Sequence, residues 1–440
     1  MKKYNKYKDS GIEWIGGIPE QWETKRLKDI SNVQSSNVDK KIKDGQKPVF
    51  LCNYVDVYKN DFIDNSIKFM PSTASDSEIK RFSLEVGDIM FTKDSESFDD
   101  IANSAVVIEE LKDIICGYHL AHVRADRKYL VPNYLSKLFH SIDYNYWFQI
   151  NATGITRVGL GLSSIRDSLT LLPPISEQTQ IATYLDTKTK VIDKKIKLLK
   201  RKTKHYKAYR KTLINEVATK GLDNDISTWT VKRLKDIGFL YSGLSGKSGN
   251  DFNQESNPNN KGFIPFTNIA NNTYLDKNHL GTVVIDEKEN QNQVKKNDIF
   301  FLMSSEGYED IGKSALLRDD IEETYLNSFC KGFRITNKNC YASFINYLLL
   351  CDNYRQKMLI EGKGFTRINL KMEKVNNFSI TIPPTKNEQQ KIADYLDAKT
   401  ATIDSILKNI ETQINTLKEL RKTLINEVVT GKVKVSSDLQ

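Results

Sequence analysis

The stretch RKTLINEV occurs twice in this chain, at residues 210–217 and again at residues 421–428, an offset of 211. Eight identical residues in a row exceed what a shared preference for helix would produce. Upstream, EQTQIATYLDTKTKVID (residues 177–193) aligns with EQQKIADYLDAKTATID (residues 388–404) at the same offset. The chain is therefore a tandem duplication with a unit of about 210 residues, long enough for one domain in each copy.

Shorter islands of identity extend the duplication upstream in each copy. GITRVGL (residues 154–160) matches GFTRINL (residues 364–370), SESFDDIANSA (residues 95–105) matches SEGYEDIGKSA (residues 305–315), and WETKRLKDI (residues 22–30) matches WTVKRLKDI (residues 229–237). Between these islands the copies hardly agree. Variable loops on a repeated scaffold are where recognition is expected.

The repeated ends predict two long helices that pair as a coiled coil. Apolar residues recur every seven positions, the spacing of a coiled-coil seam. We expect helices over residues 175–221 and 385–431, each after a Pro-Pro pair, with Ser176 and Asn387 as N-caps. At about 1.5 Å per residue, about 42 residues give a rod of about 60 Å, although an ordinary core helix remains an alternative. The seam residues are Leu185, Ile192, Leu199, Leu213, Leu396, Ile403, Ile410, Leu417 and Leu424.

The bodies of both copies predict a mixed α/β fold. Residues 81–93 and 292–304 are typical of a polar turn that enters a buried strand, and residues 104–108 and 314–318 of a second strand. Residues 133–141 and 343–354 have helical spacing. Each body should therefore have a core of its own.

Composition restricts the class of protein and of partner. The net charge of +9 permits a polyanionic partner without requiring one. Residues 188–211 hold a dozen Lys and Arg against the single acidic Asp193, which suits a phosphate-facing surface or simply a solvated one. Five cysteines without a CxxC pair, and no apolar run of membrane or signal-peptide type, predict a cytoplasmic protein with reduced thiols.

Motifs for chemistry are scarce. The chain has no glycine-rich phosphate loop, no amino-methyltransferase motif and no convincing set of nuclease carboxylates. Cys116, His119 and His122 are spaced like metal ligands, but the second copy has Phe329 and Gly332 where the histidines stand, so we expect no metal. We therefore predict no catalytic residues and no cofactor bound by this chain.

Both copies share the pattern Gly-x-Thr-Arg, which is the best candidate for a contact with nucleic acid. The guanidinium of Arg157 or Arg367 suits phosphate or a guanine edge, and the hydroxyl of Thr156 or Thr366 can bond a phosphate oxygen. An intramolecular Arg–carboxylate pair that ties the body to its helix is an equal alternative. The predicted DNA-binding residues are Lys93, Ser95, Thr156, Arg157, Ser305, Lys313, Thr366 and Arg367.

The order of motifs, led by YKDSGIEWIGGIPEQWETKRLK (residues 7–28), resembles the specificity subunit of type I restriction-modification enzymes over essentially the whole chain. The resemblance implies an α+β fold: two target recognition domains separated by two conserved helices that form an antiparallel coiled coil with pseudo-twofold symmetry. The implied organisation is an N-terminal arm at residues 1–21, recognition domains at residues 22–174 and 222–384, helical spacers at residues 175–221 and 385–431, and a tail at residues 432–440.

The resemblance also implies a function. Each recognition domain would read one half of a bipartite, gapped sequence in double-stranded DNA, while the helices set the spacer and dock two methylation subunits. Restriction subunits would join them. S-adenosylmethionine, ATP and Mg²⁺ would belong to those partners, and this chain would be non-catalytic. The alternative is a coiled-coil scaffold without a DNA role, which would lack salt-sensitive DNA binding.

Overall fold

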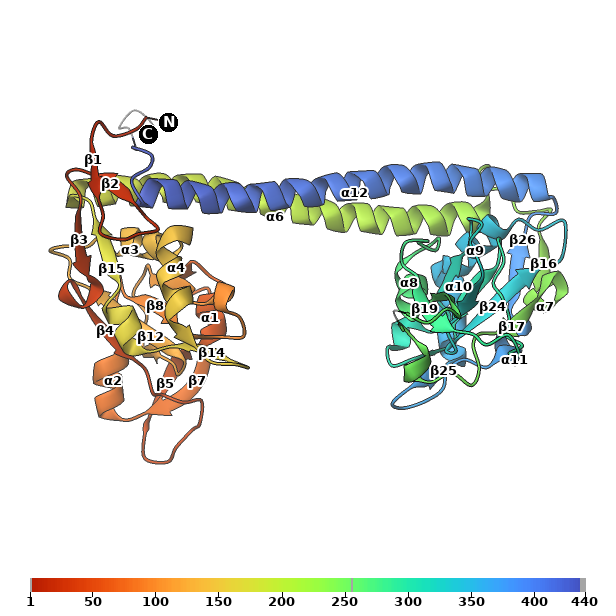
Figure 1. Ribbon diagram of the computed structural model, residues 1–440, viewed down its shortest axis with the longest axis horizontal. Helices are drawn as coiled ribbons and strands as arrows, with labels where there is room; N and C mark the ends of the chain where they lie inside the picture. Colours follow the sequence, from red (N-terminus) through yellow and green to blue (C-terminus); the bar gives the residue numbers. More distant parts are fainter. Residues whose placement is uncertain (1, 255, 436–440) are drawn as a thin grey trace. The chain divides into compact units, whose positions relative to one another are not determined.

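The computed structural model describes residues 2–254 and 256–435 (Figure 1). It confirms mixed α/β bodies and two long helices. The chain divides into two compact units. The first comprises residues up to Lys200 together with those from Glu411, and the second comprises Arg201–Ile410. Each unit therefore consists of one globular part, called here its body, and half of each long helix.

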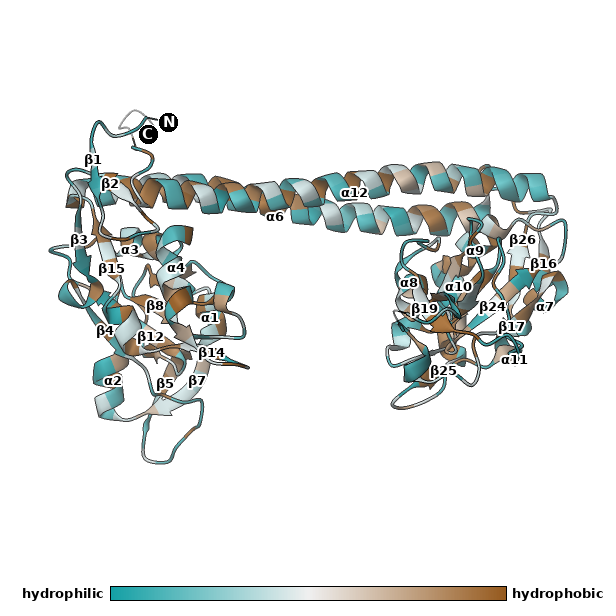
Figure 2. Cartoon of the chain, in the orientation of Figure 1, coloured by the Kyte–Doolittle hydropathy of each residue, from teal (hydrophilic) through white to brown (hydrophobic). Residues whose placement is uncertain are grey.

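The long helices are α6 (Ile175–Lys220) and α12 (Lys386–Val429). In the first unit the start of α6 packs against the end of α12, and in the second unit the start of α12 packs against the end of α6. The helices are thus antiparallel in both units. Every predicted seam residue is buried or partly buried, which confirms the coiled coil. Apolar and polar residues alternate along both helices (Figure 2).

The predicted N-caps were wrong, because α6 begins at Ile175 and α12 at Lys386, each one residue before the predicted cap. Ser176 and Asn387 therefore lie inside the first turn. The hydroxyl of Thr385 accepts the N–H of Glu388 at 3.2 Å, and the carbonyl of Pro174 accepts the N–H of Glu177 at 2.8 Å. These groups satisfy the free N–H groups that every helix start presents.

Both helices end at a glycine, as the sequence predicted. Gly221 and Gly431 each have φ of 75°, the left-handed conformation that terminates many helices. A Cβ at Gly221 would lie 3.3 Å from the ring of Trp229, and one at Gly431 would lie 2.4 Å from Pro19. The glycines therefore permit both the turn and the close approach of the chain that begins each body.

The first body is built on a five-stranded sheet in the order β4-β12-β8-β10-β6, with only β10 and β6 parallel. A three-stranded sheet, β11-β5-β7, and helices α1 to α5 complete it. The strands are β4 (Ser31–Ser35), β5 (Lys47–Cys52), β6 (Phe62–Ile63), β7 (Met70–Ala74), β8 (Ile89–Thr92), β10 (Ser104–Val107), β11 (Ile114–Cys116) and β12 (Leu120–Ala125). The helices are α1 (Tyr54–Tyr58), α2 (Asp76–Phe82), α3 (Pro132–Phe139), α4 (Ile142–Asn151) and α5 (Leu162–Arg166).

The second body repeats this plan with a four-stranded sheet, β17-β24-β20-β22, and a three-stranded sheet, β19-β18-β23. Its strands are β17 (Gly238–Ser242), β18 (Asn260–Ile264), β19 (Gly281–Val284), β20 (Ile299–Leu302), β22 (Ser314–Leu316), β23 (Thr324–Leu326) and β24 (Cys330–Ile335). Its helices are α7 (Leu234–Ile237), α8 (Phe266–Asn271), α9 (Ala342–Leu350), α10 (Asp352–Glu361) and α11 (Met372–Asn376). The single helix predicted over residues 343–354 is divided at Cys351 into α9 and α10.

A two-stranded ribbon joins each body to the helix that follows it. β3 (Glu23–Arg26) pairs with β15 (Leu169–Leu172), and β16 (Thr230–Arg233) pairs with β26 (Ser379–Ile382). Only the first unit has an N-terminal arm, formed by β1 (Tyr7–Asp9) and β2 (Gly17–Pro19). In this arm the hydroxyl of Tyr7 donates to the carbonyl of Gly431 at 3.2 Å, which covers the end of α12.

The repeated Glu-Gln near each helix start has a structural explanation. Gln178 and Gln389 are fully buried. The side-chain carbonyl of Gln178 accepts the N–H of Val131, and its amide donates to the carbonyls of Tyr129 and Pro173. Gln389 makes the same three bonds in the second unit, to Tyr341, Asn339 and Pro383. One amide thus fixes each helix start to the loop before the body's first long helix.

The opening stretch RKTLINEV has an equivalent role at each helix end. Arg421 pairs with Asp193 across the two helices at 3.1 Å, and Arg210 pairs with Asp404 at 2.9 Å. The side-chain carbonyl of Asn426 accepts the N–H of Asp143 at 2.9 Å, and that of Asn215 accepts the N–H of Asp352 at 2.8 Å. Each copy therefore binds the partner helix and the first turn of a body helix, α4 or α10.

The domain limits proposed from the sequence remain predictions, since the compact units cut both long helices rather than separating helices from bodies. The end of the predicted tail lies outside the described residues. Within residues 2–254 and 256–435, no helix is both long and apolar enough to cross a bilayer.

Replacing Gln389 by leucine should destabilise the second unit by about 2–4 kcal/mol, because one backbone N–H and two carbonyls would lose their buried partner. Urea unfolding followed by circular dichroism measures this loss. Gln390→Leu, at the exposed neighbouring position, is the matched control and should change stability by less than about 0.5 kcal/mol. Equal stability of the two variants would contradict the anchoring role.

Candidate nucleic-acid interface

In the first body, the Gly-x-Thr-Arg stretch is the tip of a hairpin formed by β13 (Ala152–Thr153) and β14 (Val158–Leu160). β14 also pairs with β9 (Asp94–Ser95), which continues directly from β8 of the main sheet. The N–H of Leu160 donates to the carbonyl of Lys93 at 2.7 Å. The structure therefore brings two islands of the duplication together at one edge of the body.

The second body repeats this hairpin and its anchor. β25 (Ile368–Asn369) pairs with β21 (Ser304–Ser305), and the N–H of Leu370 donates to the carbonyl of Met303 at 2.8 Å. Lys363 and Asn369 close the hairpin with two backbone hydrogen bonds. Thr366 and Arg367 are exposed, as are Thr156 and Arg157 in the first body.

The two predicted serines lie beneath this surface. Ser95 and Ser305 are buried, and their hydroxyls accept the N–H groups of Ser97 and Gly307 at 3.3 and 3.0 Å. This geometry favours a role in shaping the loop after β9 or β21. Lys93 is partly buried, and its ammonium lies 3.5 Å from the carboxylate of Asp94.

The tip arginines face solvent rather than the long helices. Arg367 lies 4.6 Å above the ring of Phe329 and 3.3 Å from the carboxylate of Glu306, which is itself 79% exposed. An exposed ion pair of this kind is weak, so a phosphate can replace the carboxylate. The alternative that Arg367 ties its body to a helix is wrong, because its partner belongs to the same body.

Arg157 has a tyrosine, Tyr54, as its neighbour, and the pKa of this tyrosine is raised overall. Burial and the nearby carboxylate of Asp100 raise the pKa of Tyr54, whereas Ser95 and Arg157 lower it. The phenol therefore stays neutral at physiological pH. Tyr54 stacks on Tyr58 with ring centroids 5.7 Å apart. The first hairpin thus stands beside a pair of aromatic rings that can contact a sugar or a base.

Exposed aromatic residues near the hairpins were missed at the sequence level. Tyr118 and Phe329 lie in equivalent turns before β12 and β24, and both are about half exposed. The available signal was the aromatic or histidine residue at equivalent positions 119 and 329. That signal is weak without knowledge that the N–H of Met303 donates to the carbonyl of Phe329, because Met303 directly precedes β21, the strand that supports the hairpin.

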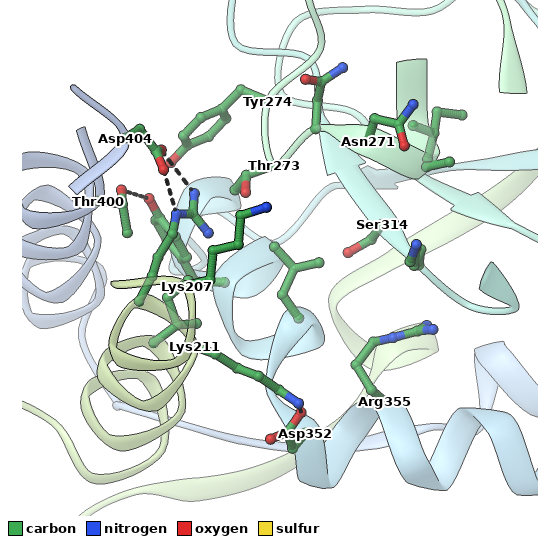
Figure 3. A pocket seen from close by; sticks show the side chains of 18 of the residues that line it. Lys207, Lys211, Asn271, Thr273, Tyr274, Ser314, Asp352, Arg355, Thr400 and Asp404 are labelled. Atoms are coloured by element: carbon green, nitrogen blue, oxygen red, sulfur yellow. Dashed lines mark hydrogen bonds and ion pairs between the residues drawn. The ribbon is translucent and has the colours of Figure 1, made fainter. Parts of the chain in front are cut away.

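Lys313 is the one predicted residue that the structure places at a different feature. Its ammonium bonds Asp310 at 2.6 Å, and it lines a cleft of about 1110 Å³ between the body of the second unit and its long helices. Figure 3 shows Lys207 and Lys211 from α6 and Arg355 from α10 around this cleft. Burial lowers the pKa of Arg355 to about 10, which leaves it charged at neutral pH.

The residues with metal-like spacing do not converge. Cys116 is a buried free thiol, His119 bonds Asp94 at 2.5 Å, and His122 faces Asp88 at 2.8 Å. In the part of the chain that the structure describes, no group of three or more His, Cys, Asp or Glu residues could hold a metal ion.

Comparisons with known proteins agree on one family. Residues 226–416 match the family model described as the type I restriction modification DNA specificity domain. A Methanocaldococcus jannaschii protein assigned as the specificity subunit of the type I restriction enzyme MjaX is 23% identical over 96% of both chains. The EcoKI specificity subunit of Escherichia coli K12 is 31% identical over 33% of this chain and 31% of that protein.

The fold also has a solved counterpart. A chain from a structure on complex assembly and conformational transition of the type I R-M system superposes with a TM-score of 0.73, covering 94% of this chain and 99% of that chain at 16% identity. This likeness covers both bodies and both long helices. The family model and the curated relatives thus all indicate a specificity subunit of a type I restriction-modification enzyme, and the solved structure shares the duplicated body-and-helix fold.

Proposed function

We propose that this chain recognises DNA sequence for a type I restriction-modification complex, with each body reading one half of a bipartite, gapped target. The observation that carries the proposal is the duplicated hairpin, which presents a threonine and an arginine beside variable loops in both bodies. Phosphate contacts position a protein on DNA, whereas loops that differ between the bodies can specify different bases. The two long helices would set the distance between the half-sites.

The same helices are the proposed docking surface for two methylation subunits. Their seam residues are buried or partly buried between the helices, so we expect docking to use the exposed positions. Tyr209 and Leu420 precede the two copies of RKTLINEV and are 54% and 51% exposed. Two equivalent apolar positions suit two copies of one partner.

Restriction subunits would complete the complex. S-adenosylmethionine, ATP and Mg²⁺ would be bound by the partners, and this chain would supply recognition without catalysis. The likeness to specificity subunits supports this division of labour, because a specificity subunit is named for selecting the target. The scaffold alternative has no support among the comparisons.

Deleting the gene for this chain should abolish one methylated motif in the genome. Modified-base sequencing of cells that carry this gene with its neighbouring methylase gene should reveal a gapped, asymmetric motif, because the two bodies differ in sequence. Cells that lack only this gene are the control. Persistence of every motif in those cells would contradict the recognition role.

Arg367→Ala should weaken DNA binding by the assembled complex about tenfold and reduce the slope of log affinity against log salt by about 1, since one phosphate contact is lost. Filter binding at several salt concentrations measures both. Arg157→Ala should act in the same way on the other half-site. Arg233→Ala removes an arginine of similar exposure on β16 and is the matched control. Unchanged affinity for both tip variants would argue against the contact.

Tyr209→Asp should weaken the docking of one methylation subunit without altering the unfolding midpoint, because a charge is placed on a half-exposed apolar position. Native mass spectrometry should then detect a complex with one methylation subunit rather than two. Leu420→Asp should give the same result, and the double variant should bind neither. Tyr209→Phe is the conservative control. Complexes with two methylation subunits in all variants would place docking elsewhere.

A further inference from the structure

The residue between the glycine and the threonine of each hairpin is apolar and entirely exposed. Ile155 is 101% exposed and Phe365 is 106% exposed, whereas the next most exposed large apolar side chain among the described residues, Ile42, is 73% exposed. A single exposed apolar residue is ordinary on a protein surface. The same position in both copies, at the end of the same hairpin, indicates that something covers it in the working complex.

The backbone holds each side chain outward by a conformation that requires glycine. Gly154 has φ of 136° and Gly364 has φ of 145°. A Cβ on either glycine would lie 2.0 Å from the carbonyl oxygen of Arg157 or Arg367. Only a residue without a side chain permits this tight turn. The hairpin base is in turn bonded to the strand that leaves the main sheet, so the tip stands on a firm support.

The neighbours of the tip are suited to DNA rather than to a protein core. A threonine hydroxyl and an arginine follow the apolar residue directly. In the second body the guanidinium of Arg367 lies against the ring of Phe329, at 4.6 Å. An apolar end with a cation beside it matches a stacked base-pair step with phosphates on both sides. Arg367 already faces the carboxylate of Glu306 at 3.3 Å, but that pair is exposed and weak, so a phosphate can replace the carboxylate.

We propose that Ile155 and Phe365 are wedges that insert against a base-pair step, each in the half-site that its own body reads. This inference rests on the proposed DNA-recognition function and adds a mechanism to it. Apolar side chains that enter a base step unstack it and bend the duplex, so sequences that unstack easily are favoured without a hydrogen bond to any base. Phe365 can also stack on a base face, whereas Ile155 can only fill the opened step.

The test uses the full complex with its methylation subunits and duplexes in which 2-aminopurine replaces adenine at successive positions of the target. Binding by the wild-type complex should raise the fluorescence at one step in each half-site, apart from the base that the methylation subunits flip out for methylation, because 2-aminopurine brightens when it unstacks. Phe365→Ala should abolish the increase in one half-site only and lower affinity by about 5- to 150-fold, the range for loss of one base–aromatic stack. Ile155→Ala should abolish the increase in the other half-site.

Four comparisons make the result specific. Phe365→Trp should keep the fluorescence increase, since indole also stacks. Val231→Ala removes an apolar side chain that is 67% exposed on β16 and should change nothing. The salt slope of Phe365→Ala should equal that of the wild type, because no phosphate contact is lost. Since Phe365 buries no surface in the chain, its replacement should also leave the unfolding midpoint unchanged.

The inference is overturned if Phe365→Ala binds and brightens 2-aminopurine as the wild type does. It is also overturned if the wild-type complex binds its target specifically without brightening any position other than the flipped base, or if the variants lose methylation subunits rather than DNA affinity. A wild-type complex without any specific DNA binding would instead refute the proposed function itself, so the two failures are distinguishable.

Discussion

The structure depends on the burial of each helix end against the body that does not immediately precede that helix in the chain. The end of α12 packs in the first unit, where Leu424 and Ile425 join the core, and the end of α6 packs in the second unit through Leu213 and Ile214. Neither body would be covered by its own helix alone. Apolar contacts alone do not fix how a helix is rotated about its axis. The asparagine in each RKTLINEV fixes this rotation, because its side-chain amide both accepts a hydrogen bond from the body helix and donates one to it.

This constraint explains the uneven identity between the copies. The helix starts and ends carry Gln178, Gln389, Asn215 and Asn426, which make matching hydrogen bonds in both units, so changes there would leave buried groups unpaired. Other contacts at the same place have diverged. Asp186 pairs with the buried Lys137, whereas Asp397 accepts from the hydroxyls of Tyr274 and Tyr347. Different pairs can satisfy one carboxylate, so the helices keep their sequence while the bodies change.

The candidate interface likewise combines a support that both bodies share with surroundings that differ between them. A short hairpin is bonded to the strand that extends from the main sheet, and this support is the same in both bodies. What differs is the surroundings: stacked tyrosines near the first hairpin, and Phe329 beneath Arg367 near the second. Two bodies that recognise different sequences can therefore approach DNA in the same way. The cleft lined by Lys207, Lys211 and Arg355 belongs to the second unit and adds cationic side chains beside the helices.

The sequence by itself determined the duplication, the two long helices with their seven-residue seam, the glycine ends and the alternation of body and helix. These features are local, because periodicity and helix termination are set by neighbouring residues. Only the tertiary structure decided that Ser95 and Ser305 are buried, that Lys313 lines a cleft, and that Ile155 and Phe365 stand free at hairpin tips. Burial depends on which distant segments meet, as β9 meets β14, and no local pattern records such pairings.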